Sequence, residues 1–144
     1  MKKVLLIIGV ITLLIGCSTP KDNSQSNVIL IEKYVQAVEN LDYQTMEDLL
    51  DEKYIGLGPS INDSIGKIDA IKNWKSNVKN LYKNIDYNKS RNIAVHIPDG
   101  ENKGEWVSNW AELTIVYQSE EQATIWVNTV YKMENGKIVP GRMG

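Results

Sequence analysis

The chain has 144 residues, a formal net charge of −2 and one cysteine, Cys17. This length suits one domain and is short for two, and the lack of a basic block argues against nucleic-acid binding. One cysteine cannot form a disulfide within the chain, so stability must come from the apolar core that 42% hydrophobic residues can supply.

The first 17 residues have the pattern of a targeting segment. Lys2 and Lys3 precede an apolar stretch, residues 4–16, which is shorter than the roughly 20 residues of a membrane-spanning helix. The ending Leu-Ile-Gly-Cys resembles the lipobox of bacterial lipoproteins, in which the cysteine is acylated and the leader is cleaved before it. The resemblance implies a signal peptide at residues 1–16 and attachment to the lipid bilayer through Cys17 in a bacterial cell envelope. Because Ser18 is not the Asp of an inner-membrane retention signal, it favours the outer membrane where the cell has one.

Residues 18–27 contain no hydrophobic anchor and are predicted to be flexible. Together with the lipidated Cys17 they form a predicted tether over residues 17–27. A coil of this length reaches about 17 Å. The predicted domain, residues 28–144, is therefore held close to the bilayer without being buried in it.

The first half of the domain is predicted to be helical. Apolar residues recur at helical spacing from Ile31 to Leu41, and Asp42 is suited to cap a short second helix. Residues 54–57 form a short predicted strand, and a third helix starts at Gly66.

The second half changes to the alternating pattern of strands. Residues 85–98, 106–117 and 123–133 are predicted strands, and a last strand begins at Lys137 after an Asn-Gly hairpin turn. Helices followed by an antiparallel meander predict an α+β domain, with the helices on one face of a bent sheet.

In this order and spacing the features resemble the nuclear transport factor 2-like superfamily, nearest its SnoaL-like branch. The resemblance runs from Val28 to the C-terminus and is carried by Leu41-Asp42, the strand at Tyr54, and residues 106–110 and 131–139. It implies a cone in which three N-terminal helices pack on a strongly bent antiparallel sheet around one apolar pocket. Members usually continue the last strand, whereas this sequence stops at Gly144, so either the chain is truncated or the sheet edge and pocket floor are incomplete.

Strand alternation selects the pocket candidates. Successive side chains of a strand point to opposite faces, and one face of each long strand carries no charged residue. We expect that face to meet the helices. The candidates for lining the pocket are Tyr54, Asn109, Leu113, Thr129 and Tyr131. Such neutral groups suit the orientation of a small apolar ligand, although Tyr54 and Tyr131 could equally serve only to pack the core.

No catalytic residue emerges from the same comparison. The isomerase branch of the superfamily needs a carboxylate base and an acidic donor, and the resemblance places Gly58 and Thr129 at those positions. His96 is expected at a solvated strand end and Glu112 on the outer face, so neither a metal site nor a cofactor is predicted. The alternative is an enzyme of the cyclase, isomerase or hydratase kind that acts on a small lipophilic substrate in the pocket.

The outer face of the sheet is predicted to be an interaction surface. Trp106, Trp110 and Trp126 share the outward parity, and an aromatic patch with polar surroundings is typical of an interface. In the superfamily this face often forms a dimer, so we expect a homodimer. The alternative is a β-bulge near Ser108 or Asn109 that would turn one indole inward.

Overall fold

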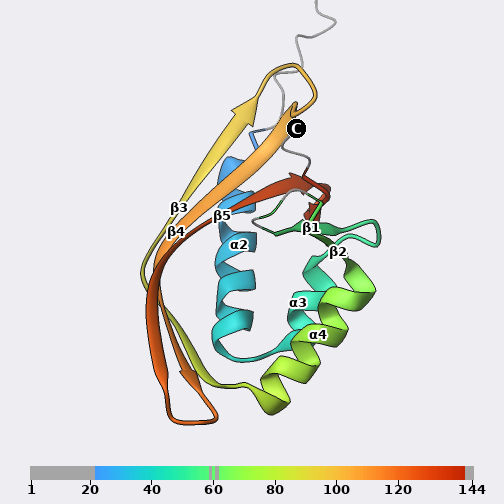
Figure 1. Ribbon diagram of the computed structural model, residues 1–144. Coiled ribbons are helices and arrows are strands. Elements are labelled where there is room, and N and C mark those ends of the chain that lie inside the picture. Colours follow the sequence, from blue (N-terminus) through green and yellow to red (C-terminus); the bar gives the residue numbers. More distant parts are fainter. Residues whose placement is uncertain (1–21, 59, 61, 142–144) are drawn as a thin grey trace, which may run out of the picture.

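The computed structural model describes residues 22–58, 60 and 62–141 (Figure 1). The predicted signal peptide and Cys17 lie outside these residues. The helices are α2 (Ser24–Glu39), α3 (Tyr43–Leu49) and α4 (Lys67–Asn80), and the strands are β1 (Ile55–Leu57), β2 (Ser64–Gly66), β3 (Tyr82–Ile97), β4 (Gly104–Tyr117), β5 (Gln122–Glu134) and β6 (Lys137–Val139).

The long strands form an antiparallel sheet in the order β3-β4-β5-β6, while β1 and β2 form a separate hairpin. Figure 1 shows this sheet curling strongly around α2, with α3 and α4 on the far side of that helix. The predicted α+β class is confirmed, as is the arrangement of three helices against a bent antiparallel sheet.

The first helix begins earlier than the sequence suggested. It starts at Ser24, inside the stretch predicted as tether, and Asn27 is buried. The prediction failed because polar side chains near the helix start bond to the local backbone. The Asp22 carboxylate accepts from the Ser24 N–H at 2.9 Å, and the Ser26 hydroxyl donates to the Asn23 carbonyl at 2.8 Å. The first of these bonds satisfies one of the N–H groups that a helix start leaves without a partner, and the second adds to the bond that the Asn23 carbonyl accepts from the Asn27 N–H at 2.9 Å.

The second helix begins where the sequence predicted. The carboxylate of Asp42 accepts a hydrogen bond from the Thr45 N–H at 3.0 Å, which satisfies one of the free donors at the start of α3.

The core joins the helices to the concave face of the sheet. Its main cluster centres on Ile31 from α2, Val107 from β4 and Ile138 from β6, all at most 1% exposed. A second cluster packs Val38 and Met46 against the other end of the sheet.

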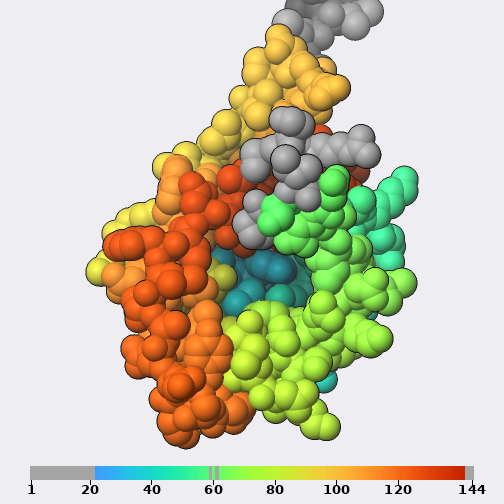
Figure 2. Space-filling model, viewed as in Figure 1, coloured from blue at the N-terminus to red at the C-terminus, as the bar shows by residue number. Residues whose placement is uncertain are grey.

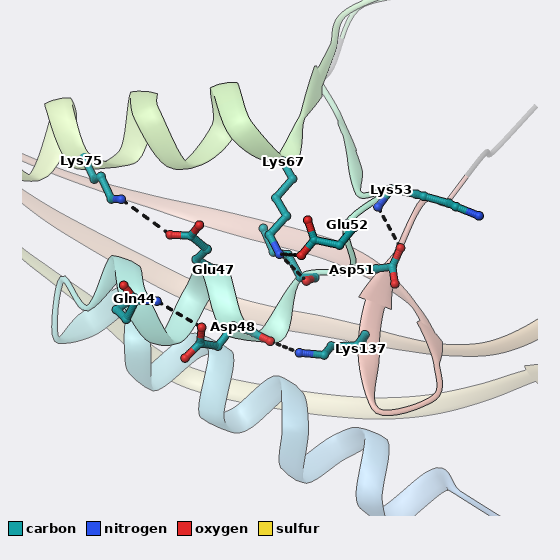
Figure 3. Close-up of polar contacts among 10 residues, drawn as sticks. Gln44, Glu47, Asp48, Asp51, Glu52, Lys53, Lys67, Lys75 and Lys137 are labelled. Carbon is teal, nitrogen blue, oxygen red and sulfur yellow. Dashed lines mark hydrogen bonds and ion pairs between the residues drawn. The ribbon is translucent and has the colours of Figure 1, made fainter.

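Strand β6 is short but firmly held. Leu50 pairs with Ile138 as an isolated parallel bridge, and the Asp51 N–H donates to the Ile138 carbonyl at 2.9 Å. Figure 3 shows two lysines beside this contact: the Lys137 ammonium donates to the Asp48 carbonyl, and the Lys67 ammonium donates to the Leu50 carbonyl at 3.0 Å. The segment between α3 and β1 is thereby fixed to both β6 and α4.

None of the helices in the described part of the chain combines the length and the apolar character needed to cross a membrane.

Candidate functional site

A cavity of about 230 Å³ lies between β1 and β5. Three of the predicted pocket residues, Tyr54, Thr129 and Tyr131, are on its wall. The remaining lining residues are Ile55, Gly56, Leu57, Trp106, Asn128, Val130, Lys132, Ile138, Val139 and Gly141. Figure 2 shows this side of the molecule hollowed between β5, in orange, and the green segment of β2 and α4, with α2 at the bottom of the hollow.

Gly56 allows Tyr54 to lie close over β1. A Cβ atom on Gly56 would be 2.8 Å from the Tyr54 hydroxyl oxygen and 3.3 Å from the Ile65 Cγ2 atom. Any side chain at position 56 would therefore push the Tyr54 ring away from its place beside the cavity.

Four tyrosines from four different segments pack together next to the cavity. They are Tyr34, Tyr54, Tyr87 and Tyr131, and the rings of Tyr34 and Tyr131 meet edge to face with centroids 5.6 Å apart. Burial raises the pKa of all four phenols, and their mutual proximity adds to the rise in the pKa of Tyr34 and of Tyr131. The phenols are therefore neutral donors at physiological pH.

Tyr34 and Tyr87 were missed by the strand-based prediction. The helical stripe that contains Ile31 and Val38 could have indicated Tyr34. Tyr87 was hidden because the β3–β4 register shifts between Asn88 and Arg91, so alternation counted from the end of β3 does not carry through to its start.

The other two predicted pocket residues belong to the core instead. Asn109 is fully buried in the middle of β4, where its amide nitrogen donates to the Ser90 hydroxyl at 2.8 Å and to the Asn92 side-chain oxygen at 2.9 Å. Its own oxygen accepts no hydrogen bond from the described residues. Leu113 packs against the second core cluster. Neither residue lines the cavity, because Asn109 lies one strand further from it than its partner Thr129 on β5, and Leu113 packs nearer the other end of β4.

The predicted patch of three indoles is wrong for Trp106. This side chain is 4% exposed, because the β3–β4 turn and the segment after β6 cover it. Its indole nitrogen donates to the Asn102 carbonyl at 2.8 Å, and a Cβ on Gly141 would come within 2.9 Å of the ring. Trp110 and Trp126 remain 42% and 71% exposed on the outer face.

The acidic side chains and the histidine of the described residues lie outside the cavity wall. Among its described lining residues there is no Asp, Glu or His, and Lys132 carries the charge, with its ammonium 5.5 Å from the centre of the Trp106 ring. His96 is exposed and 2.6 Å from Glu105, and Glu112 pairs with Lys89 at 2.7 Å. Across the described ranges, no three acidic, histidine or cysteine side chains are grouped to hold a metal ion.

We expect the tyrosine cluster to make the fold sensitive to alkaline pH. Because the folded-state pKa of each buried phenol lies above the ordinary value of 10, the stabilisation is complete below pH 10 and is lost as the pH rises above it. The free energy of unfolding should then fall by roughly 1 kcal/mol per pH unit for each phenol that stays neutral. Urea unfolding between pH 8 and pH 11 measures this decline.

The variant Tyr34→Phe should show a shallower alkaline decline than the wild type. The half-exposed Tyr43 provides the control, because Tyr43→Phe should leave the slope unchanged. Equal slopes in all three proteins would contradict the burial of the cluster.

Comparison with known proteins supports the fold. No protein-family model matches the chain, and no curated protein matches its sequence. Solved structures match it over most of its length. A putative polyketide cyclase from Xanthomonas campestris has a TM-score of 0.67 at 13% identity, covering 83% of this chain and 89% of its own. A nuclear transport factor 2-like protein from Anabaena variabilis has a TM-score of 0.62 at 15% identity, covering 87% and 91%.

An epoxide hydrolase from Mycobacterium tuberculosis, described as LEH-like, has a TM-score of 0.59 at 13% identity and covers 82% of this chain and 80% of its own. These similarities confirm the resemblance expected from the sequence at the level of the fold: the chain adopts the nuclear transport factor 2-like cone.

Proposed function

We propose that this protein binds a small, uncharged and mainly apolar ligand in the cavity between β1 and β5. The observation that carries the proposal is the composition of the wall, which combines apolar side chains with the neutral hydroxyl-bearing residues Tyr54, Thr129 and Tyr131. Lys132, the charged residue among those described on the wall, holds its ammonium over the Trp106 ring, 5.5 Å from its centre. A few neutral hydrogen-bonding groups on an apolar wall orient a ligand without requiring it to be charged.

The volume of the cavity limits the size of the ligand. About 230 Å³ corresponds to roughly eight water molecules at about 30 Å³ each. It is smaller than the roughly 300–1,000 Å³ of pockets for drug-sized ligands. The part of the ligand that the cavity encloses is therefore no larger than a short chain or a single ring.

Thermal-shift screening of residues 18–144 against pairs of neutral lipophiles and their carboxylate analogues tests the proposal. A bound ligand at 100 times its Kd stabilises a fold by about 2.7 kcal/mol, which is a shift of several degrees in Tm. We expect the neutral members of the pairs to raise the Tm and the anionic ones to have less effect. A library in which no neutral compound raises the Tm would contradict the proposal.

An enzymatic role is the second candidate. Two of the structures that share this fold are described as a putative polyketide cyclase and an LEH-like epoxide hydrolase, which supports chemistry in a cone of this kind. The absence of Asp, Glu and His from the described cavity wall weighs against acid–base turnover. Product formation from a cavity ligand, abolished by one carboxylate substitution, would favour the enzyme over the binding protein.

We propose that Cys17 anchors this domain to a bacterial envelope membrane. The support is the sequence pattern of a charged start, an apolar segment and a terminal Leu-Ile-Gly-Cys. Because the first described helix starts at Ser24, only a few residues would separate the lipid from the domain. Cys17→Ser should abolish fatty-acid labelling and release the protein from the membrane fraction, and a variant that is still processed and labelled would contradict the anchor.

We also propose that the outer face of the sheet forms a homodimer. Trp110 and Trp126 share this face with the exposed side chains of Ile93, Val95 and Val130, which form an apolar surface of the kind found at interfaces. Sedimentation of residues 18–144 at tens of micromolar should show a dimer that Trp110→Glu dissociates. A monomer at these concentrations would overturn this proposal.

A further inference from the structure

The edge of β5 next to the cavity is only partly covered by β6. Strand β6 pairs with Lys132, Met133 and Glu134 alone. The rest of β5, residues 122–131, pairs with β4 on one side and has no described strand on the other. An uncovered edge presents backbone N–H and C=O groups that can pair with another extended chain.

The backbone groups of Asn128 and Val130 face this open edge. The Ile138 carbonyl accepts a hydrogen bond from the Asp51 N–H, so the backbone groups of Ile138 point away from β5. Because neighbouring residues of a strand direct their backbone groups to opposite sides, those of Lys137 and Val139 point toward β5. Their partners on β5 are the even-numbered Glu134 and Lys132.

The β4–β5 register is continuous over the whole strand, so the alternation extends from Lys132 to Val130 and Asn128. No described backbone group outside the sheet bonds to either of these two residues.

A single strand, β6, fills the space beside the end of β5 at residues 132–134. Strand β6 itself lies between β5 and the Leu50–Asp51 segment. After Val139 the chain departs from this line, because Gly141 lies against the Trp106 ring on the outer side. Beyond the end of β6, residues 128–131 of β5 and residues 55–57 of β1 form the two sides of the cavity.

We propose that the ligand of this cavity is an extended, uncharged peptide segment that adds to β5 as an antiparallel strand along the line of β6. This inference rests on the proposed function and names the class of ligand. Residues 122–131 of β5 contain no charged side chain, proline or glycine, and half of them are β-branched, as in a strand that accepts a partner.

The residues on the inner and outer faces of the sheet beside the cavity indicate which side chains such a peptide would carry. Side chains on the inner face would meet Thr129 and Tyr131, and those on the outer face would meet Val130 and Trp106. At about 3.3 Å per residue, the three steps from residue 128 to residue 131 span about 10 Å, which matches four extended residues of a peptide that lies along the edge and is only partly enclosed by the cavity. A second copy of this chain fits less well, because the sheet behind its edge strand would meet β1.

The test uses the full-length chain in lipid nanodiscs and a phage-displayed library of unconstrained nine-residue peptides, with empty nanodiscs as the control target. We expect the selected peptides to lack charged residues in their centre and to carry apolar residues at every second position. Synthetic versions are then used in amide hydrogen exchange with the wild-type protein.

Peptide binding should slow exchange at the amides of Asn128 and Val130 at least tenfold. The amides of Thr129 and Tyr131, which bond to β4, should be unchanged. Asn128→Pro removes one N–H from the open edge and should weaken peptide binding at least tenfold. Thr124→Pro removes an N–H from the same edge outside the cavity and should leave the affinity within twofold.

Failure of this inference can be distinguished from failure of the proposed function. Neutral lipophiles that raise the Tm while no peptide is selected would overturn the inference alone. Selected peptides that protect neither amide would place binding elsewhere and overturn it as well. Self-association of the chain that Asn128→Pro abolishes would assign the edge to a second copy and overturn the peptide proposal.

Discussion

Replacing Asn109 by aspartate is expected to lower the free energy of unfolding at pH 7 by about 3–5 kcal/mol. The substitution keeps the shape of the side chain but removes the amide nitrogen that donates to Ser90 and Asn92. It also places a carboxyl group at a fully buried position whose neighbours include the Asn92 side-chain oxygen. Burial without a cation raises the pKa of a carboxyl group above its unfolded value near 4.

The stability of this Asn109→Asp variant should therefore fall as the pH rises above about 4, and urea unfolding at pH 4 and pH 7 measures the difference. Asn128→Asp is the control, because Asn128 is exposed one strand away and a carboxylate can still accept from the Ser108 hydroxyl. The control should lose less than about 0.5 kcal/mol. Equal losses in the two variants, or a loss that does not depend on pH, would contradict the burial of Asn109.

Truncation of Ile138 to alanine is expected to cost about 2–5 kcal/mol. Ile138 is 1% exposed, packs in the main core cluster and lines the cavity, although it belongs to a strand of only three residues. The neighbouring Ile31 and Val107 are fully buried and cannot fill the vacated space without moving a helix or the sheet. Urea unfolding followed by tryptophan fluorescence measures the loss.

The control for Ile138→Ala is Ile125→Ala, on β5. Ile125 is 49% exposed, so its truncation should cost less than about 1 kcal/mol. A cost at Ile138 as small as that at Ile125 would show that β6 frays in solution and that the cavity lacks this wall.

Periodicity and turn chemistry were enough to predict the α+β class and the order of its elements from the sequence, and the family resemblance added the cone. The helical spacing from Ile31, the capping carboxylate of Asp42 and the Asn-Gly turn before β6 each depend on local physics, and each is present in the structure. Two of the pocket residues, Thr129 and Tyr131, followed from alternation, because β5 carries no register shift.

The remainder of the site depends on contacts between distant segments. Alternation gives the correct outward parity for Trp106, but it cannot show that a turn and the segment after β6 fold over this ring. Similarly, Asn109 is buried as an inward residue should be, but it bonds to Ser90 and Asn92 of β3 and does not line the cavity. Tyr34 and Tyr87 meet Tyr131 only because the sheet curls, and curvature is not encoded in a period of two.

The binding affinity of a neutral cavity ligand for the wild type and for Tyr131→Phe tests the central claim most directly. A neutral hydrogen bond contributes about 0.5–1.5 kcal/mol, so loss of the Tyr131 hydroxyl from the cavity wall should raise the Kd by about 2- to 12-fold. Tyr117→Phe, at the far end of β4, should leave the Kd unchanged. A compound that raises the Tm but binds both variants and the wild type with the same Kd would contradict the assignment of this cavity as the ligand site.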